Sequence, residues 1–210
     1  PPYNFADVMA GQGTIALEIR WAEGRYERLP ALLAELVHIK VDVLVVATTP
    51  AALSAKSTAG TIPVVMVAVG DPVGSGLVAS LARPGGNVTG LSWDVTPEQA
   101  GKNLEILKEA VPKVSRVAIL RNPNVPYQMS YSKEAERAAK SLGVRVRFAE
   151  VQSFNRKELE NALGTIARER DNGVLVTPGA YFSIGPARTV IVDFLTQSKL
   201  PAIYPGDVFV

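Results

Sequence analysis

The sequence predicts an α/β protein whose two lobes, each built on a parallel β-sheet, face each other across a cleft. Short apolar runs that suit buried strands alternate with amphipathic segments of helical length, which is the pattern of parallel βαβ units. Small polar residues follow these runs in both halves, after Ala47 and Val69 and again after Leu120 and Val176. Ligands of α/β sheets bind beyond the carboxyl ends of the strands. Two such edges in one chain predict a ligand clamp.

The composition narrows the class of protein. Apolar residues make up 47% and charged residues 20% of the 210 positions, as in a folded domain. A net charge of +2 is too small to indicate a nucleic-acid partner. The chain has no cysteine, which excludes disulfides, thiol catalysis and zinc–thiolate sites. No apolar run approaches the roughly 20 residues that span a bilayer.

The elements of the first half follow from apolar periodicity and from helix-end residues. Leu29, Leu33 and Leu36 recur at helical spacing. Thr48 or Thr49 suits a helix cap, followed by Pro50 in the first turn. The expected order is a strand over 14–20, a helix over 25–39, a strand over 41–47 covered on both faces, a helix after 50, a strand over 63–69, a short helix over 77–81 and a strand over 87–93.

The second half repeats the plan after a crossover near residues 92–97. Thr96 is expected to cap a helix over 97–111, with Pro97 in its first turn. The strand over 144–151 alternates arginine with apolar residues, so we expect it at an edge of the sheet with one wet face. The other elements are strands over 116–120, 173–176 and 200–204 and helices over 129–142, 156–170 and 186–197.

The chain ends are expected to be internal to a longer protein. The sequence begins at Pro1 without a basic-then-apolar leader, and it stops soon after the last strand pattern. We expect residues 1–92 to form the first lobe, with its first strand–helix unit unclear or missing. Residues 93–205 form the second lobe, and 206–210 start a return crossover. The architecture is therefore expected to be incomplete at both ends.

Polar side chains just past the strands are the candidate ligand contacts. Hydroxyls and helix-start amides can hold a carboxylate, an aspartate can hold an amine, and a tyrosine can cover an apolar part of a ligand. The competing interpretation of each is a cap or a turn residue. The candidates are Thr48, Thr49, Asp71, Ser92, Asp94, Asn122, Asn124, Tyr127, Gln152, Thr177, Tyr181 and Asp207.

Two enzymatic interpretations are weaker. Gly74, Gly76 and Ala79 fit a dinucleotide fingerprint, with Asp94 twenty residues after Gly74, but four residues separate the first glycine from the preceding strand. His38 is the single histidine, so it would have to serve as the base of any serine catalysis, and no Gly-x-Ser-x-Gly elbow exists. No catalytic residue, metal ligand or cofactor is therefore assigned, and a nucleotide-binding Rossmann-type enzyme stays as an alternative.

Six stretches carry a resemblance to a known family, and they are residues 21–36, 62–65, 70–73, 76–90, 104–112 and 201–204. They resemble the ABC transporter substrate-binding family that includes tryptophan-binding, TrpX-like proteins, and the resemblance covers about residues 14–207. It implies a type I periplasmic-binding-protein fold of two Rossmann-like lobes. It also implies ligand contacts from the loops after Ala47, Val69, Leu120 and Val176, which adds Gly179 to the candidates.

The function that this resemblance implies is that of an extracytoplasmic solute receptor of an ABC importer. It would bind a small organic solute (an amino acid, an organic acid or an aromatic compound) by hinge closure and deliver it to a membrane permease. A monomer without nucleic acid, in the periplasm or otherwise outside the cytoplasm, is expected. The ligand-sensing core of a regulator, which shares this fold, is the second alternative.

Overall fold

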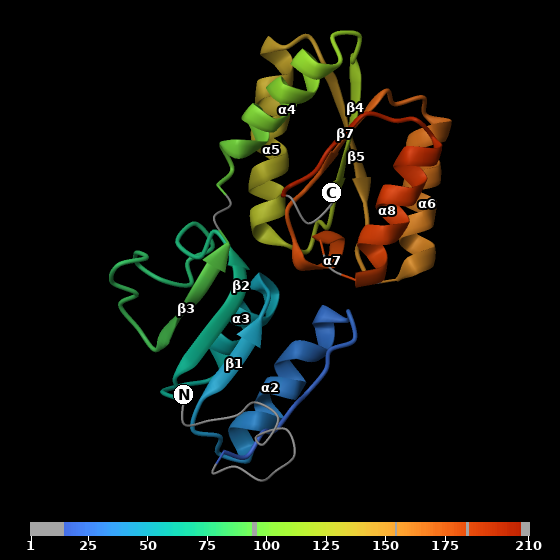
Figure 1. The fold of residues 1–210 in the computed structure, drawn as a ribbon. Coiled ribbons are helices and arrows are strands. Elements are labelled where there is room, and N and C mark those ends of the chain that lie inside the picture. The colour runs from blue at the N-terminus through green and yellow to red at the C-terminus, as the bar shows by residue number, and fades with distance from the viewer. Residues whose placement is uncertain (1–14, 94–95, 154, 184, 207–210) are drawn as a thin grey trace.

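In the computed structural model, two separate parallel sheets form the centres of two lobes (Figure 1). The structure describes residues 15–93, 96–153, 155–183 and 185–206. The N-terminal lobe holds the three-stranded sheet β1-β2-β3, and the C-terminal lobe the four-stranded sheet β5-β4-β6-β7. Every strand pair is parallel, as the alternation of strand and helix patterns predicts. The two-lobe α/β prediction is confirmed.

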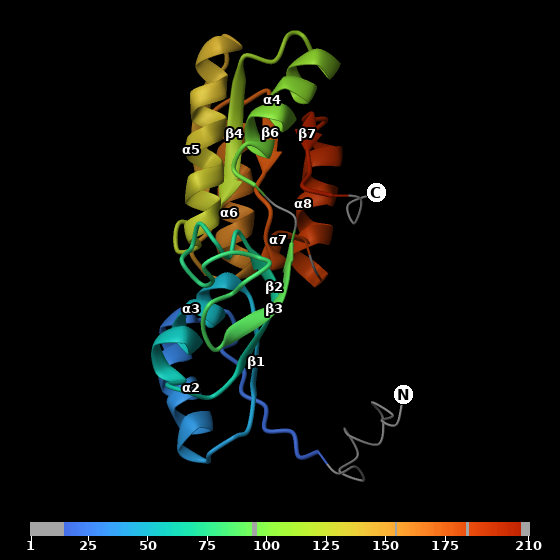
Figure 2. The ribbon, with the colours of Figure 1, turned by 90° about the vertical axis from the view of Figure 1, so that its left-hand side faces the viewer.

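The N-terminal lobe packs its helices against one face of its sheet. A 3-10 turn η1 (Tyr26–Arg28) leads into α2 (Leu29–His38), and α3 (Thr49–Thr58) joins β1 (Leu44–Ala47) to β2 (Val64–Gly70). The third strand is β3 (Val88–Trp93). Figure 2 shows α2 and α3 on the same side of the three strands. Their buried cluster includes Leu33, Leu44, Ala52, Val64 and Met66.

The C-terminal lobe has helices on both faces of its sheet. One buried cluster joins α4 (Gln99–Ala110) and α5 (Pro126–Ser141) to the sheet, and the other joins α6 (Arg156–Arg168) and α8 (Gly185–Gln197) to the opposite face. The inner strands β4 (Arg116–Arg121) and β6 (Gly173–Val176) are therefore buried almost throughout. The remaining elements are β5 (Arg145–Glu150), α7 (Ala180–Ser183) and β7 (Ala202–Ile203).

Most predicted elements are present, and β5 lies at the sheet edge as expected. The helix α5 begins three residues before the predicted start, because Pro126 occupies its first turn. The helix α4 begins at Gln99 rather than at Pro97. The short helix α7 was not predicted.

Residues 15–20 are not a strand, although they alternate as one. Within the described chain they pair with no sheet, and Ile15, Leu17 and Ile19 are each about half exposed. A strand needs a neighbour to satisfy its backbone groups, so alternation alone does not form one.

The expectation that residues 41–47 are covered on both faces is wrong. Leu44 and Val46 are buried against α2 and α3, while Val45 is 69% exposed on the other face. Leu91 on β3 is 72% exposed on the same side of the sheet. The all-apolar run reflects a strand that the N-terminal lobe covers on one side.

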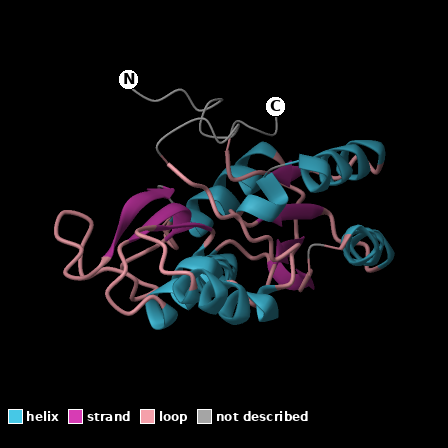
Figure 3. Cartoon of the chain, turned by 90° about the horizontal axis from the view of Figure 1, so that it is seen from below, coloured by secondary structure: helices cyan, strands magenta, loops and turns pink. Residues whose placement is uncertain are grey.

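The predicted helix over 77–81 is replaced by turns, so the chain from β2 to β3 is loop throughout (Figure 3). The amides of Leu77 and Val78 both donate to the carbonyl of Pro72, and the amide of Ala79 donates to that of Pro84. Five residues are too few to offset the cost of helix nucleation. Leu77 and Val78 are buried and fix this loop to the core.

Replacing Leu163 with alanine should lower the free energy of unfolding by about 2–5 kcal/mol, because the side chain is fully buried between α6 and the sheet. Leu91→Ala removes the same atoms from an exposed position and should stay within about 0.5 kcal/mol of the parent. Urea unfolding followed by circular dichroism measures both. Equal losses in the two variants would contradict the packing described above.

Candidate functional site

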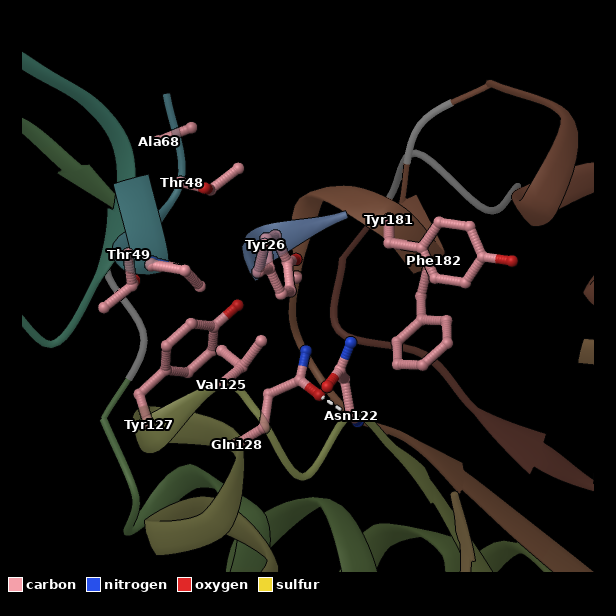
Figure 4. Close-up of a pocket in the computed structure, with 12 residues that line it drawn as sticks. Tyr26, Thr48, Thr49, Ala68, Asn122, Val125, Tyr127, Gln128, Tyr181 and Phe182 are labelled. Carbon is pink, nitrogen blue, oxygen red and sulfur yellow. Dashed lines mark hydrogen bonds between the residues drawn. The ribbon is translucent and has the colours of Figure 1, made fainter. Parts of the chain in front are cut away.

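A pocket lies between the two lobes, at the carboxyl ends of their strands (Figure 4). It holds about 350 Å³ of space, including its open mouth. The loops after β1, β4 and β6 all contribute, together with η1 and the end of β2. Its lining residues are Tyr26, Thr48, Thr49, Pro50, Ala68, Asn122, Val125, Tyr127, Gln128, Gly179, Tyr181 and Phe182.

The N-terminal wall of the pocket has a strained backbone. Thr48 has φ 84° and ψ 151°, a conformation that is almost confined to glycine. Ala68 has φ 55°, within the irregularity that shifts the β2–β3 register between Met66 and Val69. Such residues each cost about 1–3 kcal/mol and gather at ligand clamps. Their presence at this edge points to a binding role.

Thr49 fastens α3 to the end of β2. Its side chain is buried, and its hydroxyl Oγ1 accepts from the amide of Gly70 at 3.1 Å and lies 3.4 Å from the carbonyl oxygen of that residue. Thr48, the N-cap residue of α3, makes no side-chain cap bond. The predicted capping role is therefore absent at Thr48, and Thr49 instead positions the wall beside it.

Two buried amides organise the C-terminal wall. The backbone amide of Asn122 donates to Oε1 of Gln128 at 2.6 Å, and Nε2 of Gln128 donates to the carbonyl of Pro178 at 2.7 Å. Oδ1 of Asn122 accepts from the amide of Asn124 at 2.8 Å. Gln128 thus braces the loop after β4 against the loop after β6. Both side chains are only 2% exposed.

Tyr127 lies beside this brace. Its hydroxyl donates to the carbonyl of Pro178 at 2.8 Å. A side chain on Gly179 would stand 2.3 Å from Nε2 of Gln128 and 2.9 Å from this hydroxyl, so the position requires glycine. Burial raises the pKa of the Tyr127 hydroxyl to about 12 and keeps it protonated as a donor.

Aromatic side chains supply the remaining surface. Tyr26 reaches from η1 to the space between the lobes (Figure 4). Burial, and secondarily the neighbouring Tyr127, raise the pKa of Tyr26. The rings of Tyr181 and Phe182 are 5.3 Å apart at a tilt of 50°. The pocket therefore offers aromatic faces together with hydroxyl and amide groups.

Six of the predicted contact residues line this pocket, and the other predicted residues that the structure describes do not. Asp71 accepts from the amide of Gly74 at 2.8 Å, which is a turn role. Asn124 is exposed, with Nδ2 3.4 Å from the carbonyl of Gln152. Thr177 is buried and donates to the carbonyl of Leu120. Ser92 lies within β3, and Asp94 and Asp207 are outside the described residues. The six that line the pocket are Thr48, Thr49, Asn122, Tyr127, Gly179 and Tyr181.

The remaining six lining residues were missed by the sequence analysis. Tyr26 precedes a helix instead of following a strand, and Ala68 faces the pocket only because of the irregularity in β2. Gln128 was one residue outside the predicted helix, and a polar side chain in the first turn after Pro126 was the available signal. The missed residues are Tyr26, Pro50, Ala68, Val125, Gln128 and Phe182.

The glycines of the apparent dinucleotide fingerprint do not form the required structure. That motif needs a tight turn at the strand end and a helix after it. Gly74 and Gly76 instead belong to the turns between β2 and β3, and no helix begins there in the described chain. The nucleotide alternative is not favoured.

The residues that the structure describes include neither a metal-binding cluster nor a membrane-spanning helix. In this part of the chain, histidine and acidic side chains nowhere gather in the groups of three or more that could hold a metal ion. Likewise, none of the described helices combines the length and apolar character needed to cross a membrane.

Comparison with known proteins gives one family. Residues 10–209 match the family model described as ABC transporter substrate binding protein. A tyrosine-binding protein of Clostridioides difficile is 33% identical over 108 residues, which are 51% of this chain and 30% of that relative. The aligned stretch is thus less than a third of the relative's length.

Two solved structures are similar over almost the whole chain. One is an ABC domain from Streptococcus pneumonia in complex with L-Trp, at 26% identity and a TM-score of 0.76, with 98% of this chain and 68% of that chain covered. The other is a conserved domain protein from Vibrio cholerae, at 27% identity and a TM-score of 0.77, with coverage of 97% and 68%.

Thr48→Gly should raise the free energy of unfolding by about 1 kcal/mol, because glycine adopts the backbone conformation at this position without strain. Thr165→Gly on α6 is the matched control and should lower it by about 0.3–0.5 kcal/mol, since glycine is less favourable than threonine inside a helix. Urea unfolding measures both. A loss of stability in Thr48→Gly equal to that of the control would rule out strain at Thr48.

The raised pKa of Tyr127 predicts a loss of stability in alkali. The hydroxyl stays protonated in the folded chain up to about pH 12, whereas an unfolded tyrosine loses its proton near pH 10. Between these values the folded state binds more protons, so stability falls as pH rises. Tyr127→Phe should reduce this slope by up to about 1.4 kcal/mol per pH unit. Unfolding curves collected across this range test it, and an unchanged slope would contradict burial of the hydroxyl.

Proposed function

The chain belongs to the ABC transporter substrate-binding protein family, and on this premise we propose that it is the solute receptor of an ABC importer. The observation that carries the proposal is the interlobe pocket, which both lobes line with hydroxyls, amides and aromatic rings. It has the mixed apolar and polar lining of a small-molecule site.

We propose a small organic solute with a flat, partly apolar body as the ligand. The rings of Tyr26 and Tyr181 can cover such a body, and Tyr127 and Gln128 belong to a buried network of hydrogen bonds beside it. The names of two relatives, a tyrosine-binding protein and a domain in complex with L-Trp, support an aromatic amino acid as the first candidate. Organic acids and other aromatic compounds are the next candidates.

The proposed mechanism is closure of two lobes on the solute. We place the lobes at residues 1–92 and 93–205, with 206–210 starting a return crossover, and the hinge at the connection after β3. A ligand favours closure only through contacts that the closed state adds. The pocket can supply such contacts because both lobes line it. A solute that contacts Thr48 of one lobe and Tyr181 of the other would bridge the two lobes.

The proposed partner is a membrane permease, to which a monomeric receptor outside the cytoplasm delivers its solute. No catalytic step is part of this role. A ligand-sensing regulator core could use the same fold, but the family match favours the receptor.

Isothermal titration should detect binding of at least one solute from a panel of L-tyrosine, L-tryptophan, L-phenylalanine, 4-hydroxybenzoate and aliphatic amino and organic acids. An aromatic member should bind most tightly, because the rings of Tyr26 and Tyr181 line the pocket. Folded protein that binds no member of the panel would contradict the proposal.

Tyr181→Ala should weaken the affinity for the solute identified in this way by about tenfold, the equivalent of about 1.4 kcal/mol of lost ring contact. Tyr204→Ala is the matched control, because Tyr204 packs on the core of the C-terminal lobe and does not line the pocket. Equal affinities of the two variants would place the solute away from Tyr181.

A further inference from the structure

The ring of Tyr127 lies directly against the backbone of Gly70, which belongs to the other lobe. A methyl group on Gly70 would stand 3.0 Å from each of three ring carbons, Cγ, Cδ1 and Cε1. Carbon atoms in contact prefer about 3.5–4.0 Å. The φ angle of Gly70 is not in the positive region, so the ring, and not the backbone conformation, is what a side chain there would have to displace.

Each partner of this contact is held firmly in its own lobe. Tyr127 is 7% exposed, and its hydroxyl is bonded to Pro178 beside the bracing side chain of Gln128. Gly70 ends β2, and the hydroxyl of Thr49 accepts from its amide. Neither group can move without disturbing its lobe, so the contact transmits the position of one lobe to the other.

The contact also lies next to the connection between the lobes. Gly70 is the parallel partner of Trp93, the last residue of β3, after which the chain passes to α4 (Figure 1). A contact near a hinge has a short lever arm. A displacement of a few tenths of an ångström there becomes a much larger movement at the open side of the cleft.

We propose that the Tyr127 ring against Gly70 is the interlobe stop, which sets how closely the lobes approach and thereby the size of solute that the pocket accepts. This deepens the proposed function and rests on it, since a stop matters only if the lobes close on a ligand. Tyr127 acts here as a positioning residue, and Gly70 is glycine to let the ring approach.

The test measures the distance between the lobes directly. The chain has no cysteine, so spin labels on cysteines introduced at the exposed positions Ala34 on α2 and Lys133 on α5 are unique. Double electron–electron resonance gives the interlobe distance distribution without solute and with L-tyrosine or L-tryptophan. Gly70→Ala should shift the distribution to longer distances and weaken the affinity for whichever probe binds by about tenfold.

Gly86→Ala is the matched control, because a methyl group on Gly86 meets no atom within 4 Å and its φ is not positive. It should leave both distances and affinity unchanged. The double variant Gly70→Ala/Tyr127→Ala should return the distance distribution toward that of the parent, since the ring is then absent. If Gly70→Ala acted only locally, removal of the Tyr127 ring would not restore the distance distribution.

If Gly70→Ala fails to fold, Tyr127→Ala alone tests the proposal, and its interlobe distance distribution should move to shorter distances. Unchanged distances in a folded Gly70→Ala, or in Tyr127→Ala where that variant gives the reading, would overturn the proposal. If neither probe binds the parent but the solute-free distances shift as expected, the stop stands and the proposed solute class fails.

Discussion

The pocket depends on a constraint of parallel sheets, in which the carboxyl ends of all strands meet at one edge. Each lobe therefore gathers its strand-end loops on a single side, and the two sides face each other. No single element needs to be shaped for binding. Thr48 after β1, Asn122 after β4 and Gly179 after β6 are brought around one space by strand order alone. The helices complete this arrangement, because α3 and α5 begin at the same edge.

The two sides of the pocket hold their geometry by different means. The C-terminal side is held by buried hydrogen bonds, in which Gln128 and Tyr127 both donate to the carbonyl of Pro178. The N-terminal side carries backbone strain at Thr48 and Ala68, and the bond from the amide of Gly70 to Thr49 and the buried core beneath hold it in place. Hydrogen bonds of a buried network fix positions tightly. The C-terminal wall of the pocket is therefore the rigid one. The strained residues of the N-terminal wall lower stability, so folding alone does not account for them.

The sequence predicts the two sheets and half of the pocket, and the limits have identifiable causes. Periodicity identifies strands such as β4 and β6 because both of their faces are buried. It fails at residues 15–20, where a strand pattern lacks a neighbour, and at 77–81, where turns replace a helix. The rule that ligands lie past strand ends finds Thr48 and Asn122. It cannot find Tyr26, whose place depends on how η1 packs, or Ala68, whose direction depends on an irregular strand.

The lobes differ in how the described residues cover their sheets. The C-terminal sheet has a buried cluster on each face, whereas the N-terminal sheet has one and exposes Val45 and Leu91 on its other face. A solute that contacts both walls ties the two lobes together. Binding then stabilises the closed arrangement by mass action, and the strained residues at the N-terminal edge become part of a better supported structure.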